Sequence, residues 1–308
     1  MTADPTTTDV LVVGAGPAGL TAALVLARAG RSVVVLDGGA GRNAPSAHAH
    51  NVFTRDGTAP SELRRVGREQ AEGYGARFLD VEATGAEADA TGVRVRLADG
   101  TELSARRLLL ATGVVDELPD IPGLEEAWGQ TVVHCPYCHG FELRGRPTVV
   151  LGRGGAGAEF AGLITGWTDH VTLLTDGPAD LAEDHRAALA ELGVDVHEGR
   201  VGRLDVDGRD LRAVLFAGGE RMSATALYVR PPQHVRGPLV AALGLALTED
   251  GLVRTTEPGQ TSVPVVWACG DMVSPRQAVA MAAGSGMGVA AMLNHDLVAS
   301  GYGFMTAR

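Results

Sequence analysis

Two cysteines separated by two residues are the part of the sequence best suited to chemistry. Cys135 and Cys138 flank a Pro-Tyr pair, and the 308-residue chain has only three cysteines in all. Two thiols at this spacing can close a small disulfide ring, and a nearby hydrogen-bond donor can hold one of them as a thiolate. In a reducing compartment the pair therefore indicates redox chemistry or a metal site rather than a structural disulfide.

A zinc site is one alternative, because His134 and His139 adjoin the two cysteines. Zinc needs four ligands, and four such residues in one short run are too contiguous to surround a single ion comfortably. The sequence also has no second pair of cysteines. We therefore expect no metal and favour a redox-active dithiol, with two buried structural cysteines as the remaining alternative.

A glycine-rich turn lies between the first strand-like run of the chain and a helix-like segment. It carries Gly14, Gly16 and Gly19, and the next apolar run ends in Asp37. In a dinucleotide site the first glycine permits a tight turn, the second lets the backbone approach a pyrophosphate, and the third lets the helix pack on the strand. An acid at this distance accepts hydrogen bonds from a ribose. The pattern predicts a dinucleotide site; the alternative is a glycine-rich turn without a ligand.

The same order of elements recurs in the middle of the chain. Gly152, Gly154 and Gly157 follow a strand-like run and precede a helix that we expect over residues 158–167. Alternating segments farther on predict a meander within residues 204–229. A buried strand and a helix of small residues near the C-terminus then return the chain to its first domain. We expect an α/β protein with two Rossmann-like, three-layer nucleotide-binding domains, the second inserted in the first.

Composition and charge exclude several classes of partner. All 26 basic residues are arginine, and 37 acids give a formal net charge of -11. The electrostatic field of this negative charge repels phosphate backbones and anionic lipid headgroups, so nucleic acid is not expected as a partner. The longest apolar runs fall far short of the ~20 residues that span a bilayer, and the N-terminus does not look like a secretion signal. We expect a cytoplasmic protein that does not associate with a membrane.

Taken together, these motifs resemble low-molecular-weight thioredoxin reductase over essentially the whole chain. The resemblance rests on both glycine turns, the cysteine pair, Ala111-Thr112-Gly113 and Cys269-Gly270-Asp271. It implies an FAD-binding domain made of residues 1–116 and 248–308. It also implies an inserted NAD(P)-type domain, residues 117–247, that carries the cysteine pair, and a homodimer.

The resemblance further implies which residues contact FAD. The first glycine turn would hold the pyrophosphate, Asp37 the adenosine ribose and Asp271 the ribityl chain, with Gln277 and Ala278 at the flavin ring. We also place His50 and Asn51 near the flavin. The expected FAD site is Gly14, Ala15, Gly16, Pro17, Ala18, Gly19, Asp37, Gly38, Arg42, His50, Asn51, Ala111, Thr112, Gly113, Gly270, Asp271, Gln277 and Ala278.

Three departures from the reductase pattern change the expected activity. His139 follows the second cysteine, where a reductase carries an acid, and the run from His134 to Gly140 is similar to the FAD-dependent dithiol oxidases of gliotoxin and holomycin. Asp176 stands where the reductases bind the NADPH phosphate with basic residues, and Arg153 is a bulky cation in the second glycine turn. The resemblance therefore implies oxidation of a small-molecule dithiol with O2 as acceptor, without NADPH.

The same resemblance implies a role for each residue of the redox site. Cys135 would exchange with the substrate and Cys138 would pass electrons to FAD. His139 suits proton transfer, because an imidazole can both accept a proton from a thiol and stabilise a thiolate. His134 either shares this role or packs against a carbonyl group.

Two other activities stay open. One is an NADH-dependent disulfide reductase, because Asp176 lies at a distance from Gly154 at which it could hold an adenosine ribose. The other is a flavin-bearing redox sensor whose cysteine pair reports oxidation to a protein partner. Outside the site, we expect Cys269 to be a buried structural thiol and Met281, Met287 and Met292 to belong to the core.

Overall fold

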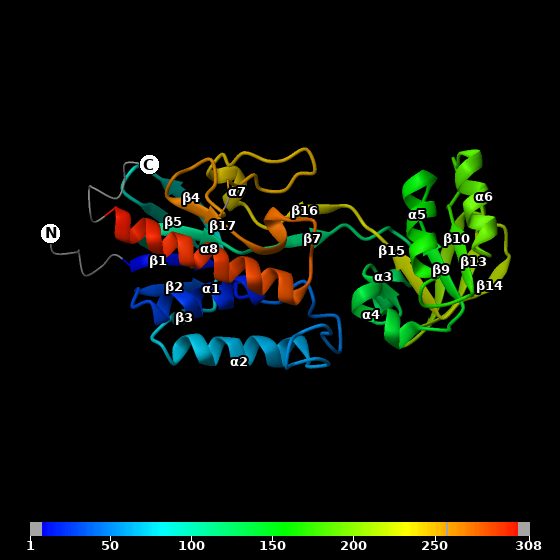
Figure 1. Cartoon of the computed structure of the whole chain (residues 1–308), viewed down its shortest axis with the longest axis horizontal. Coiled ribbons are helices and arrows are strands. Elements are labelled where there is room, and N and C mark those ends of the chain that lie inside the picture. The colour runs from blue at the N-terminus through cyan, green and yellow to red at the C-terminus, as the bar shows by residue number, and fades with distance from the viewer. Residues whose placement is uncertain (1–7, 257, 301–308) are drawn as a thin grey trace. The chain divides into compact units, whose positions relative to one another are not determined.

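The computed structural model describes residues 8–256 and 258–300, which form two compact units joined by short connections (Figure 1). The first unit contains Met1–Ala44, Asn51–Val115 and Gln233–Arg308, and the second contains Pro45–His50 and Asp116–Pro232. The return to the first unit at Gln233 comes earlier than the predicted residue 248. The reason is that helix α7 (Leu239–Ala242) buries its apolar side chains in the core of the first unit.

The first unit is built on a seven-stranded sheet with the order β3-β2-β1-β6-β5-β4, in which β17 also pairs with β6. The pairs among β1, β2, β3, β6 and β17 are parallel, whereas β4-β5 and β5-β6 are antiparallel. The strands are β1 (Thr8–Val13), β2 (Val33–Leu36), β3 (Arg77–Leu79), β4 (Ala83–Ala88), β5 (Val93–Leu97), β6 (Glu102–Leu110) and β17 (Val266–Ala268).

The buried runs of β1 and β2 explain why this sheet lies between two layers. Val10 and Val12 face a core shared with α1 (Pro17–Arg28) and α8 (Val279–Ala299), whereas Leu11 and Val13 face the opposite core. Strands buried on both faces read as continuous apolar runs rather than alternating ones. In Figure 1 the helices α1 and α8 lie side by side along the sheet, with α2 (Pro60–Glu72) beside α1.

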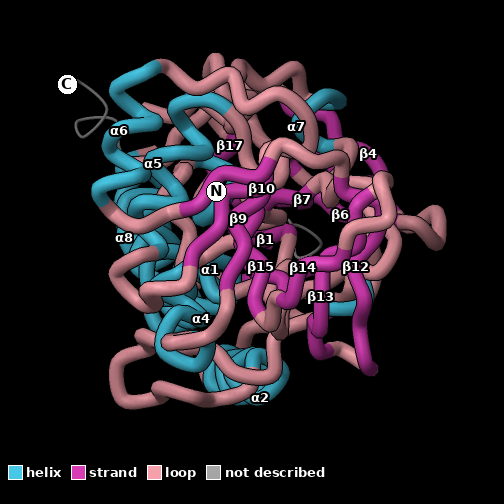
Figure 2. The backbone as a smooth tube through the Cα atoms, turned by 90° about the vertical axis from the view of Figure 1, so that its right-hand side faces the viewer, coloured by secondary structure: helices cyan, strands magenta, loops and turns pink. Residues whose placement is uncertain are grey.

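The second unit repeats the plan with a five-stranded parallel sheet of order β11-β10-β9-β15-β8. Val150 of the central strand packs with α5 and α6, and Val149 packs toward α3 and a three-stranded antiparallel sheet, β12-β13-β14. Figure 2 shows β9, β10 and β15 running together. The strands are β8 (Val132–Val133), β9 (Thr148–Leu151), β10 (Val171–Leu174), β11 (Asp195–His197), β12 (Val201–Asp207), β13 (Asp210–Phe216), β14 (Arg221–Ser223) and β15 (Ala226–Val229).

The remaining elements complete the second unit and the connections. Its helices are α3 (Leu124–Ala127), α4 (Pro136–Leu143), α5 (Gly154–Ile164) and α6 (Glu183–Glu191). The chain crosses between the units through β7 (Val114–Asp116) and β16 (Gln233–Val235), which pair as a two-stranded sheet. The short 3-10 turn η1 (Gly270–Val273) follows β17.

The predicted fold class is confirmed, and three local predictions are corrected. Helix α5 starts at Gly154 rather than residue 158, because the glycines themselves form its first turn. The meander stops at Ser223, since all four residues of β15 are buried and this strand joins the parallel sheet. Met281, Met287 and Met292 are exposed, because they lie on the face of α8 turned away from α1. Among the described helices, none is long and apolar enough to cross a membrane.

Candidate active site

The first glycine turn has the shape that a dinucleotide needs. A Cβ atom on Gly14, whose φ is +105°, would lie 2.4 Å from the carbonyl oxygen of Ala111, and one on Gly19 would lie 1.9 Å from that of Gly14. By contrast, a Cβ on Gly16 would meet no described atom within 4 Å. The first and third glycines therefore let the backbone pack closely, and the second borders open space at the N-terminus of α1. A pyrophosphate fits such a cradle, because the free N–H groups of a helix start point at it.

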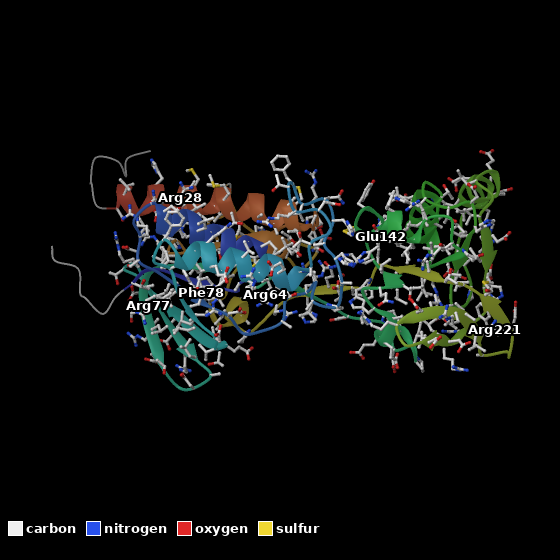
Figure 3. The ribbon with its side chains drawn as sticks, turned by 90° about the horizontal axis from the view of Figure 1, so that it is seen from below. Arg28, Arg64, Arg77, Phe78, Glu142 and Arg221 are labelled. Carbon is white, nitrogen blue, oxygen red and sulfur yellow. A yellow bond between two sulfur atoms is a disulfide. The ribbon has the colours of Figure 1, made fainter. Side chains whose placement is uncertain are left out.

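Asp37 lies directly after β2 and is held in place by two donors. Its Oδ1 accepts a hydrogen bond from the Gly39 backbone N–H at 3.1 Å, and its Oδ2 accepts one from Arg64 Nη2 at 2.8 Å. Arg64 lies on α2 (Figure 3) and also donates to the Gly39 carbonyl oxygen at 2.8 Å. A carboxylate has four lone-pair sites, so Asp37 can still accept from a ribose. Sequence reasoning missed Arg64, because no local pattern links it to Asp37.

Arg42 connects the loop after β2 with residues near the C-terminus. Its Nη1 lies 3.2 Å from Asp271 Oδ2 and 2.5 Å from Gln277 Oε1. Gln277 Nε2 in turn donates to Gln233 Oε1 at 2.9 Å. Asp271 follows Gly270, whose φ of +79° and closeness to the Ala18 side chain leave no room for a larger residue. Arg42, Asp271 and Gln277, all expected in the FAD site, are thus brought together.

The loop after β6 lies beside the first glycine turn. The Ala111 N–H donates to the Val13 carbonyl oxygen at 2.8 Å, and the Thr112 hydroxyl donates to the Arg236 carbonyl oxygen at 3.0 Å. The Arg236 N–H donates back to Gly113 at 3.0 Å. These contacts place the loop at the carboxyl ends of β1 and β6, where ligands of parallel sheets bind.

The remaining predicted FAD residues fall in both units. Pro17 and Ala18 are in the first turn of α1, Ala15 is buried in the glycine turn, and Ala278 is the residue preceding α8. Gly38 follows Asp37, and Asn51 has a φ of +59° with its N–H donated to Asp56 Oδ1 at 2.7 Å. His50 belongs to the second unit, where its Nε2 lies 3.5 Å from Glu142 Oε1.

The cysteine pair forms a disulfide at the start of α4. Cys135 precedes the helix, Pro136 is its first residue, and Cys138 lies in its first turn, with a Cα–Cα separation of 5.3 Å between the cysteines. The N–H groups of Cys138 and His139 point to the Cys135 carbonyl oxygen at 3.2 and 3.3 Å. A helix N-terminus stabilises a thiolate and makes it a better leaving group, so either reduced cysteine is placed for thiol exchange.

His139 lies one residue beyond the disulfide and is largely enclosed. Its Nε2 is 3.4 Å from the Ser46 hydroxyl, and its Nδ1 is buried with no hydrogen-bond partner in the described part of the chain. Burial lowers the pKa of His139 below 6.5; the negative charge of Glu142 partly opposes the shift and His50 adds to it. The imidazole is therefore neutral at pH 7, with one buried ring nitrogen available to exchange a proton.

Aromatic rings surround the cysteine pair. The His134 ring stacks on Trp128 with 5.7 Å between centroids, and Tyr137, which is 67% exposed, meets the edge of Trp167 at 5.5 Å. A Cβ on Gly140 would lie 2.5 Å from Trp167 Nε1, so only glycine fits there. The stacking gives His134 a packing role on Trp128, and its part in proton transfer stays a prediction.

The second glycine turn carries its own side chains across the place where a nucleotide would bind. Arg153 Nε donates to the Thr175 carbonyl oxygen at 2.6 Å, and its Nη2 donates to that of Asp176. The Asp176 carboxylate accepts the Val201 N–H at 2.8 Å and lies 3.4 Å from Arg200 Nη1. Arg153 thus lies over the ends of β9 and β10. The carboxylate of Asp176, which could hold a ribose, already has two donors.

Cys269 matches its expected structural role. It is fully buried after β17, and burial raises the pKa of its thiol to about 12. A thiol this far from ionisation does not act as a nucleophile near neutral pH.

Comparisons with known proteins agree with this geometry. The chain matches the pyridine nucleotide-disulphide oxidoreductase family over residues 8–286. Thioredoxin reductase sirT of Leptosphaeria maculans is 33% identical, covering 94% of each chain. The crystal structure of HlmI superposes with a TM-score of 0.91 at 45% identity, covering 96% of this chain and 94% of its own. Thioredoxin reductase from Streptococcus pyogenes MGAS5005 has a TM-score of 0.88 at 23% identity, covering 96% of this chain and all of its own, and shows the fold alone.

Features of both units agree with the FAD that this family implies. One unit carries the glycine cradle, Asp37 and the Arg42–Asp271 pair, and the other carries the redox disulfide. The chain belongs to the pyridine nucleotide-disulphide oxidoreductases and is a thioredoxin-reductase-like flavoprotein with the fold of low-molecular-weight thioredoxin reductase.

Proposed function

We propose that this chain oxidises a small-molecule dithiol to an intramolecular disulfide, with O2 as the electron acceptor and H2O2 as the product. The observation that carries the proposal is the neutral, enclosed imidazole of His139 directly after the Cys135–Cys138 disulfide. An incoming dithiol must lose a proton before it can attack, and a neutral imidazole takes it at physiological pH. The acid that a reductase carries at this position is already ionised at that pH and is a much weaker base.

The proposed exchange has two steps at the cysteine pair. A substrate thiol gives its proton to His139, and the resulting thiolate attacks Cys135 Sγ while the bond to Cys138 breaks, leaving the Cys138 thiolate. His139 passes this proton to the Cys138 thiolate and then takes the proton of the second substrate thiol. The second substrate thiolate attacks the substrate sulfur of the mixed disulfide, and Cys135 leaves as a thiolate that receives this proton from His139. The substrate is now a disulfide, and the enzyme holds two electrons and two protons as a cysteine dithiol.

FAD, when bound, supplies the two-electron chemistry that returns these electrons to O2. The residues that would hold it are the first glycine turn at the pyrophosphate, Asp37 at the ribose, and Arg42 with Asp271 along the ribityl chain. Cys138 is the sulfur we assign to the flavin side, and His139 holds or returns the proton as each sulfur changes charge.

The second glycine turn supports an enzyme that does not need a nicotinamide. Arg153 lies across the ends of two strands through its bonds to Thr175 and Asp176, and a nucleotide would have to displace it.

An NAD(P)H-dependent disulfide reductase is the second candidate. The family and the name of thioredoxin reductase sirT favour it, and the second unit keeps the parallel sheet of a nucleotide fold. The two candidates differ in the electron donor. A reductase bleaches its flavin with NADH or NADPH under anaerobic conditions, whereas the oxidase bleaches only with a dithiol.

Oxygen uptake by the purified yellow protein tests the proposal. We expect uptake with stoichiometric H2O2 when dithiothreitol or a reduced dithiolopyrrolone is added, and none with NADH or NADPH alone. Turnover that requires a nicotinamide would overturn the oxidase and establish the reductase. Thiol consumption that stops after one equivalent would instead indicate a redox sensor.

A small, partly apolar dithiol of the holomycin or gliotoxin type is the substrate we favour. The exposed ring of Tyr137, between the two cysteines, supports this choice, because an aromatic surface suits a compact heterocycle. Comparing such a dithiol with reduced thioredoxin at equal thiol concentration tests this choice of substrate.

We also propose a homodimer, for which light scattering coupled to size-exclusion chromatography should give twice the 31.8 kDa chain mass.

A further inference from the structure

A short segment of the loop after β2 belongs to the unit that carries the disulfide. Residues Pro45–His50 leave the first unit after Ala44 and return to it at Asn51, but they pack with the second unit. Three contacts hold them there. Arg209 Nη2 donates to the Pro45 carbonyl oxygen at 2.7 Å, the Ser46 hydroxyl lies 3.4 Å from His139 Nε2, and His50 Nε2 lies 3.5 Å from Glu142 Oε1.

We propose that Ser46 is a positioning residue for His139 and that the His50–Glu142 pair sets the charge beside it. Ser46 would accept the Nε2 proton of His139 and so fix the tautomer whose Nδ1 carries the lone pair. The inference rests on the proposed function, because it assumes that His139 takes the proton of the incoming thiol.

The surroundings of the two ring nitrogens of His139 support this tautomer. Nε2 has the Ser46 hydroxyl as its partner, whereas Nδ1 is buried and has none among residues 8–256 and 258–300. A neutral imidazole carries one proton and one lone pair, and the Ser46 hydroxyl can either accept from Nε2 or donate to it. Because a buried N–H without a partner is rarely left in a protein, the proton belongs on Nε2 and the lone pair on Nδ1. With Nε2–H donated to Ser46, Nδ1 keeps the lone pair, and water does not compete for it because the atom is buried.

Two charged groups act on this imidazole, and a third titratable group, Tyr228, interacts with one of them, Glu142. Glu142 lies three residues beyond His139 on α4 (Figure 3), so the two share one face of the helix. The charge of Glu142 raises the pKa of His139, and His50 lowers it. Tyr228 of β15 is the third group; burial first, and then Glu142, raise the pKa of its hydroxyl to about 12, so it is neutral. The proton affinity of His139 therefore depends on the balance between Glu142 and His50.

The segment stays attached to the second unit without the two side chains in question. Arg209 Nη2 donates to two carbonyl oxygens, that of Pro45 and, at 2.5 Å, that of Trp128. The arginine therefore links the segment to the backbone at Trp128. Pro45 packs against Gly129, where a Cβ would lie 2.8 Å from the proline ring. Substitutions at Ser46 and His50 should therefore change the surroundings of His139 without releasing the backbone.

The first experiment follows reduction of the Cys135–Cys138 disulfide in the anaerobic holoenzyme by dithiothreitol. Acid quench, alkylation and mass spectrometry count the free thiols at each time point, independently of the flavin. We expect Ser46→Ala to slow the reduction at pH 7 about 3- to 10-fold, which is the effect of losing one ordinary hydrogen bond to the imidazole. Ser46→Thr, which keeps the hydroxyl, should restore the rate, and Ser223→Ala on β14 is the matched control.

A pH series from 5 to 9 tests the charge balance. The rate should fall on the acid side as His139 takes up a proton. His50→Gln removes the neighbour that lowers the pKa of His139 and should move this fall to higher pH, whereas Glu142→Gln removes the neighbour that raises this pKa and should move the fall to lower pH. His170→Gln and Glu159→Gln, whose side chains lie elsewhere on the second unit, should leave the profile unchanged.

Wild-type rates in Ser46→Ala at every pH would overturn the role of Ser46, and shifts of the same sign in His50→Gln and Glu142→Gln would overturn the charge balance. Failure of the proposed function looks different. In that case the wild-type disulfide would still be reduced by dithiothreitol with the expected pH profile, but no O2 would be consumed.

Discussion

Arg42 Nη1 and Asp271 Oδ2 lie 3.2 Å apart, although the two residues are far apart in the sequence. The pair joins the loop after β2 to the turn after β17, and both side chains are mostly buried, with 15% and 21% of their areas exposed. A charge pair enclosed in this way is sensitive to loss of either member, because the other is left partly buried without a partner.

Removing Arg42 should therefore weaken FAD retention. We expect Arg42→Ala to cost about 1–3 kcal/mol of FAD binding, roughly 5- to 150-fold in affinity, because Asp271 and Gln277 lose their charged donor. The ratio of flavin to protein absorbance after dialysis measures this. Arg65→Ala removes an exposed arginine whose partners all lie on α2, and it should keep the flavin. Equal retention in both variants would contradict the assignment of Arg42.

Gly16 and Gly19 should respond differently to the same substitution. Gly16→Ala meets open space and keeps an ordinary φ of -77°, so the apoprotein should keep its stability but lose FAD, because the methyl group enters the cradle. Gly19→Ala would place a Cβ 1.9 Å from the Gly14 carbonyl oxygen, which should destabilise the fold itself by about 1–3 kcal/mol or more. Thermal unfolding of the apoproteins, with flavin absorbance, separates the two effects. A Gly16→Ala protein that holds FAD normally would show that the turn does not face the cofactor.

Cys138→Ser should keep the yellow FAD and lose turnover. The substitution leaves the first unit unchanged but removes the sulfur that we place on the flavin side. Absorbance near the flavin maximum and O2 uptake with dithiothreitol measure the two properties together. An active Cys138→Ser enzyme would rule out the proposed path of electrons, and Cys269→Ser is the control for a cysteine outside the redox site.

His139 should make the protein less stable in mild acid. Burial lowers its folded-state pKa below 6.5, so between these two pKa values the unfolded chain binds a proton that the folded chain does not. This contribution to stability is complete above pH 6.5 and is lost as the pH falls toward the folded-state pKa. His139→Gln should therefore lose less stability than the wild type between pH 8 and pH 5.5 in urea titrations, and it should also slow turnover about 10²- to 10⁴-fold. Parallel pH curves for the two proteins would mean that His139 is solvated.

Alkylation should separate the redox cysteines from Cys269. Iodoacetamide at pH 8 should modify two thiols in the reduced native protein, because burial raises the pKa of Cys269 to about 12 and encloses the sulfur. The third should react only after unfolding in guanidinium. Mass spectrometry of the intact chain counts the additions. Three rapid additions to the native protein would show that Cys269 is accessible.

The motifs of this chain could be predicted from the sequence because their requirements are local. Gly14 and Gly19 are needed wherever a strand, a tight turn and a helix follow one another, and the structure shows the backbone contacts that exclude a Cβ at both. The spacing of Cys135 and Cys138 likewise predicted that the two sulfurs can form a disulfide, and the structure adds that this disulfide lies at the start of α4. Continuous apolar runs predicted the buried strands β1, β2 and β9, since period and burial are encoded within a few residues, whereas buried β15 was predicted as part of a meander.

The partners of the functional side chains were decided by the tertiary structure. Three contacts join segments that no periodic pattern in the sequence relates. They are the contacts of Arg64 with Asp37, Ser46 with His139 and Glu142 with His50. His50 contacts Glu142 on the helix of the cysteine pair, because its short segment packs with the second unit, and its place near the flavin stays a prediction. The methionines of α8 show the same limit, since an apolar side chain becomes core only where another element covers it. Spacing fixes what a residue can do, but its partner depends on packing between distant segments, which local sequence does not encode.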